Sequence, residues 1–461
     1  MTWKLSEIAN AVNGKLVNAS EDVTVTGVQF DSRKLKAGHL FVPLIAQRNG
    51  HDFIQSAIDN DAVAAFWSED DKAIPRDFPV IKVDDTHQAL IEFAKWHLNN
   101  VNPLKVAITG SNGKTTTKDM VAAVLSEQYK THKTQGNFNN DIGVPMTLLG
   151  MSTDTEAIVV EMGMDKPGEI SELSQMAHPD IAIITMIGES HIEFFGSREK
   201  IAEAKVEILD GLNDEGLFIA NGDEPLLEGA ITELKNSNSS KRVKTFGTKD
   251  TNDLYSQEIE TEKRQTSFRI NVDLNKQLTI PTPGSYNVNN ALAAILVGLQ
   301  VKMPLDLIAK GLQGFQLTKN RLEWLDGVNG SSILNDAYNA SPSSMKAVLD
   351  YFSTLEVKGK KIAVLGDIRE LGELSEELHA SIHKSIDPEL IDVVYLYGVE
   401  MEALYQKIEK QFDDQTLIYI KEDQDDLITK LKGQIQAHDV VLLKSSFGTN
   451  LLNVIEQIKE H

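Results

Sequence analysis

The sequence predicts an α/β protein of three domains, and three observations lead to this prediction. Apolar runs typical of buried strands alternate with helical patterns through most of the chain, as in mostly parallel sheets covered by helices. One such strand, at 106–108, runs into a glycine-bearing loop and then a helix. A length of 461 residues fits about three domains.

Two breaks in this pattern locate the domain boundaries. Pro103 precedes the strand at 106–108, and a second break falls at 314–319. The expected domains are a small α/β domain at 1–100, a central, mostly parallel domain at 101–315 and a Rossmann-like domain at 316–461.

The elements of each domain follow from local patterns. Residues 1–8 resemble an amphipathic helix, and the turn-like stretches 31–33 and 38–43 divide the first domain. In the central domain we expect strands at 106–108, 157–160 and 181–187, helices after Gly113 and at 169–176, a polar loop at 236–241 and β alternation over 254–280. In the last domain we expect strands at 361–366, 393–397 and 440–443.

Composition excludes several classes of function. Lys and Arg number 45 against 68 Asp and Glu, and the net charge of −23 argues against nucleic acid as a partner. The absence of cysteine excludes disulfides, thiolate metal sites and a cysteine nucleophile. No apolar run approaches the ~18 residues of a membrane span, and the N-terminus is no signal peptide, so we expect a cytoplasmic protein without membrane contact. The oligomeric state stays open, with a monomer as the expectation.

The loop after the strand at 106–108 is the most informative motif. Backbone N–H groups and a helix N-terminus converge there, an arrangement that suits a nucleotide phosphate. Ile108 occupies the first-glycine position of the usual P-loop spacing, so the loop is a shorter variant. A Gly/Asn turn before an ordinary helix is the simpler alternative, but it leaves the lysine and hydroxyl run unexplained. The predicted phosphate-binding residues are Gly110, Ser111, Asn112, Gly113, Lys114, Thr115 and Thr116.

Three polar residues follow in the central domain. Glu161 and His191 come after expected strands, where open α/β sheets bind ligands, and an acid there can hold Mg²⁺. Each also has a structural interpretation, as a helix-capping acid and as a core histidine. Lys205 lies on a helical pattern and, by itself, is typical of a surface lysine.

Further polar residues surround the second boundary. Asn287 and Asn290 share one face of a helix start, where amides can pair with a nucleobase edge or cap the helix. Arg321 follows the boundary, and the segment 336–342 follows an expected strand end.

Together these motifs resemble the Mur ligases, ATP-dependent amide ligases that build the peptidoglycan stem peptide. The resemblance spans nearly the whole chain and keeps the family's order. The segments 30–33, 136–140, 336–342 and 365–372 resemble the branch that adds D-alanyl-D-alanine to UDP-MurNAc-tripeptide, and the D-N-P-R motif of the diaminopimelate-adding branch is absent.

The resemblance implies a reaction and a role for each residue. ATP would phosphorylate a carboxylate, and an amine would displace phosphate from the acyl phosphate. Lys114 would contact the β/γ-phosphates and Thr115 a first Mg²⁺, with a second metal on Glu161 and His191 and a carbamylated Lys205 supporting Mg²⁺. The other implied contacts are Asn287 and Asn290 with adenine, Arg321 with the γ-phosphate, Asp336 with ribose, Ser32 and Arg33 with the uridine diphosphate, Asn137 and Asn140 with the muramoyl substrate, and Tyr338 and Asn339 with the acceptor.

Two departures from the family pattern stand out. Lys-Gly-Ser appears here as Lys444-Ser445-Ser446, which argues against a close backbone approach at that point. Phe194 and Phe195 follow His191 where glycine is commoner, and we expect them to alter the substrate fit.

Other functions compete with this interpretation. Another Mur-type ligase, including folylpolyglutamate-type or cyanophycin-type enzymes, would share most motifs, although the Asp-Ser-Arg segment favours a UDP-linked substrate. A nucleotide-dependent switch would use the same loop but leave Glu161, His191 and Lys205 unexplained. The sequence does not distinguish L-lysine from diaminopimelate at the third stem position.

Overall fold

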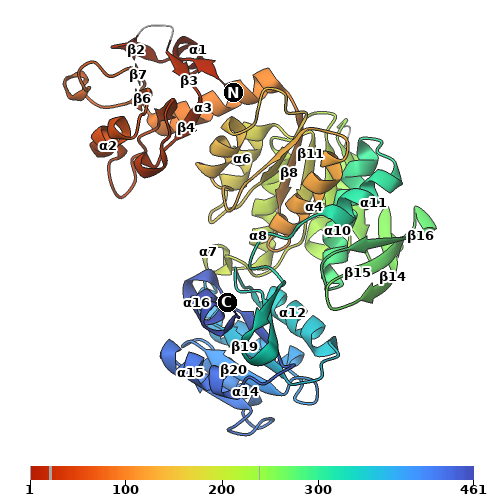
Figure 1. Cartoon of the computed structure of the whole chain (residues 1–461). Helices are drawn as coiled ribbons and strands as arrows, with labels where there is room; N and C mark the ends of the chain where they lie inside the picture. Colours follow the sequence, from red (N-terminus) through yellow and green to blue (C-terminus); the bar gives the residue numbers. More distant parts are fainter. Residues whose placement is uncertain (1, 20–22, 238, 461) are drawn as a thin grey trace.

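A computed structural model describes residues 2–19, 23–237 and 239–460 of the chain. Its elements form three successive sheet-based parts, with the N-terminal part at one end and the C-terminal part at the other (Figure 1). Among the described residues, no helix is long and apolar enough to cross a membrane. The three-part α/β architecture expected from the sequence is confirmed.

The first part is a five-stranded sheet in the order β2-β7-β6-β5-β4, beside a small antiparallel pair, β1 with β3. The expectation of a helix over 1–8 is wrong at its start, because Trp3 and Lys4 form β1 and the helix begins at Leu5. The indole of Trp3 packs against Phe93, which anchors this end to the long helix α3. The bounds are β1 Trp3–Lys4, α1 Leu5–Ala11, β2 Lys15–Val17, β3 Thr24–Val25, β4 Gly27–Gln29, β5 His39–Phe41, α2 Ile54–Asp59, β6 Ala64–Trp67, β7 Val80–Lys82 and α3 Thr86–Val101.

The central part is a nine-stranded sheet in the order β16-β15-β14-β13-β12-β11-β8-β10-β9. Strands β8 to β14 pair in parallel, and β15 and β16 add an antiparallel edge. Apolar faces of α4, α10 and α11 share one core with this sheet. The bounds are β8 Leu104–Thr109, α4 Lys114–Ser126, β9 Thr131–Lys133, α5 Gly143–Leu149, β10 Ala157–Glu161, α6 Glu169–Ala177, β11 Ile181–Ile184, α7 Ile192–Phe195, α8 Arg198–Val206, β12 Leu217–Asn221, α9 Glu228–Asn236, β13 Arg242–Gly247, β14 Leu254–Thr261, β15 Thr266–Ile270, β16 Asp273–Ile280, α10 Tyr286–Gln300 and α11 Leu305–Gly314.

The last part is a six-stranded sheet in the order β17-β18-β22-β19-β20-β21, parallel except for β17. Its buried strands are almost wholly apolar, as parallel strands covered on both faces require. The bounds are β17 Glu323–Gly327, β18 Ser331–Asn335, α12 Pro342–Thr354, β19 Lys361–Gly366, α13 Ser375–Ala380, β20 Val393–Tyr397, α14 Glu402–Ile408, β21 Leu417–Ile420, α15 Gln424–Gln434, β22 Val440–Lys444 and α16 Leu451–Ile458.

Strand ends locate the polar residues that the sequence singled out. β8 lies between β10 and β11, so the phosphate loop, Glu161 and the segment after β11 emerge at one edge of the sheet. Two expected ends shift: β10 includes Glu161 as its last residue, and β11 stops at Ile184 rather than at residue 187. The longer segment between Ile184 and α7 carries His191 away from the strand.

Candidate active site

A cavity of about 700 Å³ lies between the central and last sheets. Its wall combines the phosphate loop and other central residues with residues that follow the second boundary. Among the residues expected from the sequence, the wall contains Ser111, Asn112, Gly113, Lys114, Thr115, Thr116, Asn137, Asn140, Glu161, His191, Asn287, Asn290, Arg321, Asp336, Tyr338 and Asn339. Gly110, Lys205, Ser32 and Arg33 do not line it.

The phosphate loop is held in shape by two glycines. Gly110 and Gly113 have positive φ angles of 152° and 81°. A Cβ at Gly110 would collide with the Thr185 hydroxyl, and one at Gly113 would lie 2.5 Å from Asn290 Oδ1. Both positions therefore exclude a side chain on backbone and steric grounds.

Lys114 closes over this loop from the first position of α4. Its Nζ donates to the carbonyl oxygen of Gly110 at 2.8 Å and to that of Ser111 at 3.4 Å. Burial lowers the pKa of Lys114, Glu161 opposes this effect, and Arg321 adds to it. The loop thus carries a partly buried cation on the cavity wall, where an anion can bind.

Glu161 has one oxygen engaged and one without a hydrogen bond. Oε1 accepts from Asn139 Nδ2 at 3.0 Å, whereas the buried Oε2 has no hydrogen-bond partner and lies 3.8 Å from Lys118 Nζ. Asn139 also lines the cavity, so in the segment 136–140 it is this amide, besides Asn137 and Asn140, that reaches the site. The sequence offered no signal that separates the three asparagines.

His191 stands in the left-handed backbone region, with φ 66° and ψ 17°. Its Nδ1 lies 2.7 Å from Oε2 of Glu370 and 3.3 Å from Oδ1 of Asp165. The proximity of His191 holds the pKa of Glu370 below its usual value, against the effect of burial, although the buried Nδ1 makes no hydrogen bond of regular geometry. Sequence reasoning missed Glu370 and Asp165, because they reach His191 only through the fold.

Lys205 is completely buried on α8 beneath the site rather than on its wall. The interpretation as a surface lysine is therefore wrong. Burial, reinforced by the charge of Lys114, puts the pKa of Lys205 well below its usual value. Within the part of the chain that the structure describes, no hydrogen bond or ion pair reaches this amine.

Asn287 and Asn290 line the cavity and are also joined to each other. Asn290 Nδ2 donates to Asn287 Oδ1 at 3.0 Å, and Asn287 Nδ2 donates to the carbonyl oxygen of Pro283 at 2.7 Å. Thr117 Oγ1 donates to Asn290 Oδ1 at 3.1 Å, which ties α10 to the helix after the phosphate loop. The two amides thus line the cavity and also hold α10 against α4.

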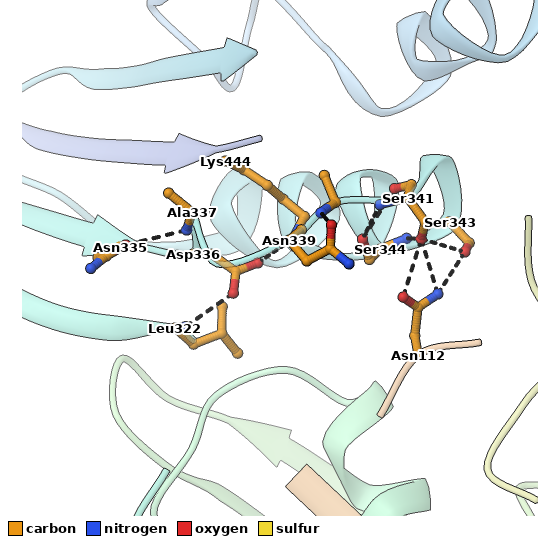
Figure 2. Close-up of polar contacts among 11 residues, drawn as sticks. Asn112, Leu322, Asn335, Asp336, Ala337, Asn339, Ser341, Ser343, Ser344 and Lys444 are labelled. Atoms are coloured by element: carbon orange, nitrogen blue, oxygen red, sulfur yellow. Dashed lines mark hydrogen bonds and ion pairs between the residues drawn. The ribbon is translucent and has the colours of Figure 1, made fainter. Parts of the chain in front are cut away.

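Residues from beyond the second boundary contact the phosphate loop directly. Arg321 Nη2 donates to Thr115 Oγ1 at 3.2 Å, and its guanidinium carbon lies 4.6 Å from the ring centre of Tyr338. Figure 2 shows a second link, in which Asn112 Nδ2 donates to Ser341 Oγ at 2.9 Å and to Ser343 Oγ at 3.2 Å. The central and last sheets therefore meet at the loop itself.

A buried Lys444 and a partly buried Asp336 form an ion pair on the cavity wall (Figure 2). Lys444 Nζ lies 2.5 Å from Asp336 Oδ2 and donates to the carbonyl oxygen of Asn339 at 3.2 Å. The backbone N–H of Leu322 donates to Asp336 Oδ1 at 3.1 Å. These contacts fix the Asp336 carboxylate beside the start of the segment after β18.

Neither departure from the family pattern narrows the cavity. Ser445, which stands in place of the glycine, is buried, donates from its Oγ to the carbonyl oxygen of Ser446 at 3.1 Å and does not line the cavity. Phe195 is buried and Phe194 is 53% exposed, but neither lines the cavity. An effect of these two rings on the substrate fit therefore stays a prediction.

Ser32 and Arg33 lie in the first part, outside the cavity. Ser32 is buried and accepts from Ser56 Oγ at 3.1 Å. Arg33 is exposed and its Nε donates to Asp31 Oδ1 at 2.9 Å, and this hydrogen bond lowers the pKa of Asp31. The structure thus does not bring these two residues to the phosphate loop.

A helix N-terminus, two glycines and a partly buried lysine at the edge of a parallel sheet define a nucleotide-phosphate site. Three family models match the chain: "Mur ligase family, catalytic domain" over 24–97, "Mur ligase middle domain" over 108–298 and "Mur ligase, glutamate ligase domain" over 320–447. The chain belongs to the Mur ligase family.

Relatives match it along its whole length. UDP-N-acetylmuramoyl-tripeptide–D-alanyl-D-alanine ligase of Bacillus subtilis strain 168 is 42% identical over 458 residues, covering 99% of this chain and 98% of the relative. The enzyme of that name from Escherichia coli K12 is 33% identical, at 99% and 98% coverage. A crystal structure of MurF from Acinetobacter baumannii has 27% identity and a TM-score of 0.88, at 99% and 98% coverage. MurF of Thermotoga maritima in complex with ADP has 26% identity and a TM-score of 0.80, at 94% and 97% coverage.

Proposed function

We propose that this chain is an ATP-dependent ligase that joins D-alanyl-D-alanine to UDP-MurNAc-tripeptide in peptidoglycan synthesis. The carrying observation is the cavity in which the phosphate loop and Glu161 face Arg321 and Asp336 from the last sheet. The names of the full-length relatives support the same reaction. A phosphate site shared between two parts of the chain suits a reaction that couples nucleotide to a second substrate.

The reaction has two steps. The substrate carboxylate oxygen attacks the γ-phosphorus of ATP, the bond to the β-phosphate oxygen breaks, and ADP leaves an acyl phosphate. The amine of the dipeptide then attacks the acyl carbon, inorganic phosphate leaves from the tetrahedral intermediate, and the amine loses a proton. Charge collects on the phosphoryl oxygens, so positioning and electrostatic stabilisation account for most of the catalysis.

The nucleotide roles follow from the wall of the cavity. Lys114 would exchange its contacts with the loop carbonyl oxygens for the β/γ-phosphates, and Arg321 lies beside the Thr115 hydroxyl where it would meet the γ-phosphate. Asn287 and Asn290 would meet adenine and Asp336 the ribose. We also assign Gly110, Ser111, Asn112, Gly113 and Thr116 to the phosphate-binding loop.

The cavity also fits Mg²⁺. Glu161 Oε2 is a buried carboxylate oxygen without a hydrogen-bond partner, and hydroxyl and carboxylate oxygens are the ligands that Mg²⁺ prefers. Within the described residues no group of three or more His, Cys, Asp or Glu side chains could hold a metal ion, so phosphate oxygens would complete the coordination. Thr115, Glu161 and His191 would hold the ions, which would screen the substrate carboxylate from the γ-phosphate.

Lys205 is proposed as a carbamate that supports this metal site. Burial lowers the pKa of the Lys205 amine and so raises its neutral, nucleophilic fraction, in which the nitrogen can bond to the carbon of CO₂ and release one proton. The resulting anion would suit a neighbourhood that already contains the Lys114 cation.

Substrate contacts are proposed at both ends of the molecule. Asn137 and Asn140 on the cavity wall would contact the muramoyl substrate, and Tyr338 and Asn339 the dipeptide. Ser32 and Arg33 would meet the uridine diphosphate. We further propose domains at 1–100, 101–315 and 316–461, a monomeric state and a cytoplasmic location.

The test supplies UDP-MurNAc-tripeptide, ATP and Mg²⁺ with each candidate amine, alone and in combination, and measures phosphate release. We expect turnover only when both substrates are present and fastest with D-alanyl-D-alanine, because an amine lacking its amide and carboxylate leaves polar groups of the site unmatched. Faster ligation of L-lysine, D-glutamate or L-alanine would assign another branch of the family. Phosphate release from ATP alone would favour a nucleotide switch. Parallel tripeptides carrying L-lysine or diaminopimelate identify the third stem residue.

A further inference from the structure

The linker 315–322, which joins α11 to β17, is attached to α4 at two points. Thr318 Oγ1 donates to Asp119 Oδ2 at 2.7 Å, and Arg321 Nη2 donates to Thr115 Oγ1 at 3.2 Å. Thr115 and Asp119 are four residues apart on α4 and therefore share one face of that helix. The linker thus follows the helix that begins at the phosphate loop, with Arg321 at the end nearer the loop.

Asp119 is a buried carboxylate with both oxygens engaged. Its side chain is only 3% exposed. Lys133 Nζ donates to Oδ1 at 2.7 Å, and Lys118 Nζ lies 3.5 Å from the same oxygen. A buried carboxylate is costly unless it is paired and hydrogen-bonded, so these two lysines hold Asp119 in place. The other oxygen, Oδ2, accepts from Thr318.

The residues that follow Thr318 are held by the last sheet instead. Asn335 Nδ2 donates to Asn320 Oδ1 at 2.8 Å, and the N–H of Leu322 donates to Asp336 Oδ1 at 3.1 Å (Figure 2). Asn320 and Leu322 have positive φ angles of 63° and 48°, a conformation that is rare for a leucine. The change from one attachment to the other therefore falls at the single residue between Thr318 and Asn320.

We propose that Asp119 and Thr318 are positioning residues that fix the pivot between the central and last sheets and keep Arg321 within reach of the phosphate loop. Arg321 follows Thr318 by three residues, which span at most about 11 Å, so Arg321 stays near α4 however the last sheet turns. Arg321 Nε is buried without a hydrogen-bond partner, and a phosphate oxygen would supply one. The role in ligation rests on the proposed function, whereas the pivot does not.

The pivot is measured on the full chain as the distance between two spin labels. The chain has no cysteine, so Lys130→Cys and Lys384→Cys, both at exposed positions, place one label in the central part and one in the last. Spectra are recorded with ATP and Mg²⁺ but without an amine. We expect Thr318→Val, which removes the hydroxyl and keeps a branched side chain, to broaden the distance distribution, and Thr318→Ser to leave it unchanged. An unchanged distribution in Thr318→Val would overturn the proposal.

Kinetics supply the second readout. A hydrogen bond to a charged group is worth about 10- to 100-fold in an equilibrium constant, and we expect Thr318→Val to lower kcat by at least about tenfold. The KM for ATP should change less than about threefold, because Lys114 and the loop backbone are untouched. Thr318→Ser should recover most of the rate. In an Arg321→Ala background, followed by single-turnover phosphate release, Thr318→Val should cause no further loss, and an additive loss would overturn the positioning of Arg321.

Two further variants separate this role from stability and from linker composition. Gln316→Ala alters an exposed side chain in the same linker and should leave the distance distribution and kcat unchanged. Asp119→Asn removes the charge that Lys133 and Lys118 pair with, so it should lower the thermal midpoint, whereas Thr318→Val should not. An equal fall in kcat for Gln316→Ala, or an equal fall in the midpoint for Thr318→Val, would assign Thr318 a structural role. If the unsubstituted protein ligates another amine, the proposed function fails while the distance result stands.

Discussion

The two ends of the cavity differ in how completely their polar groups are satisfied. At the nucleotide end, Lys114 is bonded to loop carbonyl oxygens, and Asn290 is bonded to both Asn287 and Thr117, so that among the described residues of this end only Arg321 Nε is buried without a partner. At the end where Glu161 and His191 lie, Glu161 Oε2 and His191 Nδ1 are buried without a hydrogen bond, and Lys205 is buried outside the cavity wall.

The nucleotide end is therefore largely preformed, whereas the end with Glu161 and Lys205 is incomplete without a ligand. Buried polar groups without partners are costly, so their presence at one end indicates that bound ions or substrate supply the missing partners. At the nucleotide end, a ligand must instead replace contacts that already exist. Substitutions at the two ends should therefore differ in their balance between activity and stability.

The largest effect is expected at the nucleotide end. Lys114→Ala removes a charge-assisted phosphate contact, which should cost about 3 kcal/mol or more of transition-state stabilisation, about 100-fold or more in kcat/KM. The fold should persist, because the lysine contacts only the loop backbone. Steady-state phosphate release and circular dichroism measure the two quantities. Lys130→Ala, in an exposed pair with Asp154, is the control and should keep full activity. Near-normal turnover in folded Lys114→Ala would remove this lysine from the site.

At the end with Glu161 and Lys205, we expect a substitution that lowers activity to raise the stability of the fold. Lys205→Met should nearly abolish ligation and yet stabilise the fold by about 1–3 kcal/mol, because it replaces a buried, unpartnered amine with an apolar chain of similar length. Calorimetry in CO₂-free buffer measures the stability. Small carboxylic acids should partly restore activity to Lys205→Ala by supplying an anion. Full activity in Lys205→Arg, which cannot form a carbamate, would contradict the proposed modification.

The stability gained in Lys205→Met should depend on pH in a defined direction. The folded-state pKa of Lys205 lies below the ordinary value of 10.5, so the unfolded chain binds more protons between the two values. The stability of the unsubstituted protein therefore rises with pH through that interval. The advantage of Lys205→Met should be largest below the lowered pKa and shrink as the pH approaches 10.5.

The link between Asn112 and α12 predicts a smaller effect, about tenfold in kcat/KM. Asn112→Ala removes hydrogen bonds to Ser341 and Ser343, each worth about 0.5–1.5 kcal/mol, and should weaken docking of the last domain. Substitutions of the two serines distinguish an effect on domain docking from an effect on folding stability. Ser341 also caps α12 by accepting from the N–H of Ser344, so Ser341→Ala should cost about 1 kcal/mol of stability. Ser343→Ala should leave stability nearly unchanged, as followed by circular dichroism in urea. Equal stability losses would contradict this division.

Sequence reasoning identified the local parts of this site and missed the contacts between distant segments. The phosphate loop was predictable because Gly110 to Thr115 encode strand end, turn and helix start consecutively. The burial of Lys205 was not, since the pattern of α8 does not reveal which elements cover it. The pairing of His191 with Glu370 depends on how two domains meet, and no local periodicity reports that.

The same limit explains smaller misses. Trp3 and Lys4 have a helical pattern, but pairing with β3 converts them to a strand. Asn139 is chosen over Asn137 and Asn140 as the partner of Glu161 by the path of one loop. In each case a tertiary contact overrides or selects among local preferences.

The smallest effect on stability is expected for Arg33→Ala. This substitution tests a residue of the first domain, outside the cavity. The guanidinium of Arg33 is exposed and paired only with Asp31 in the described structure, and exposed ion pairs contribute little to folding. The thermal midpoint should therefore stay unchanged. If the first domain holds the uridine diphosphate, loss of this cation should raise the KM for UDP-MurNAc-tripeptide about tenfold, as expected for one charge-assisted phosphate contact, and leave the KM for ATP as it was. Lys34→Ala removes a neighbouring exposed cation and is the matched control. A rise in the KM for ATP would mean instead that Arg33 acts at the phosphate loop, which the position of that residue outside the cavity argues against.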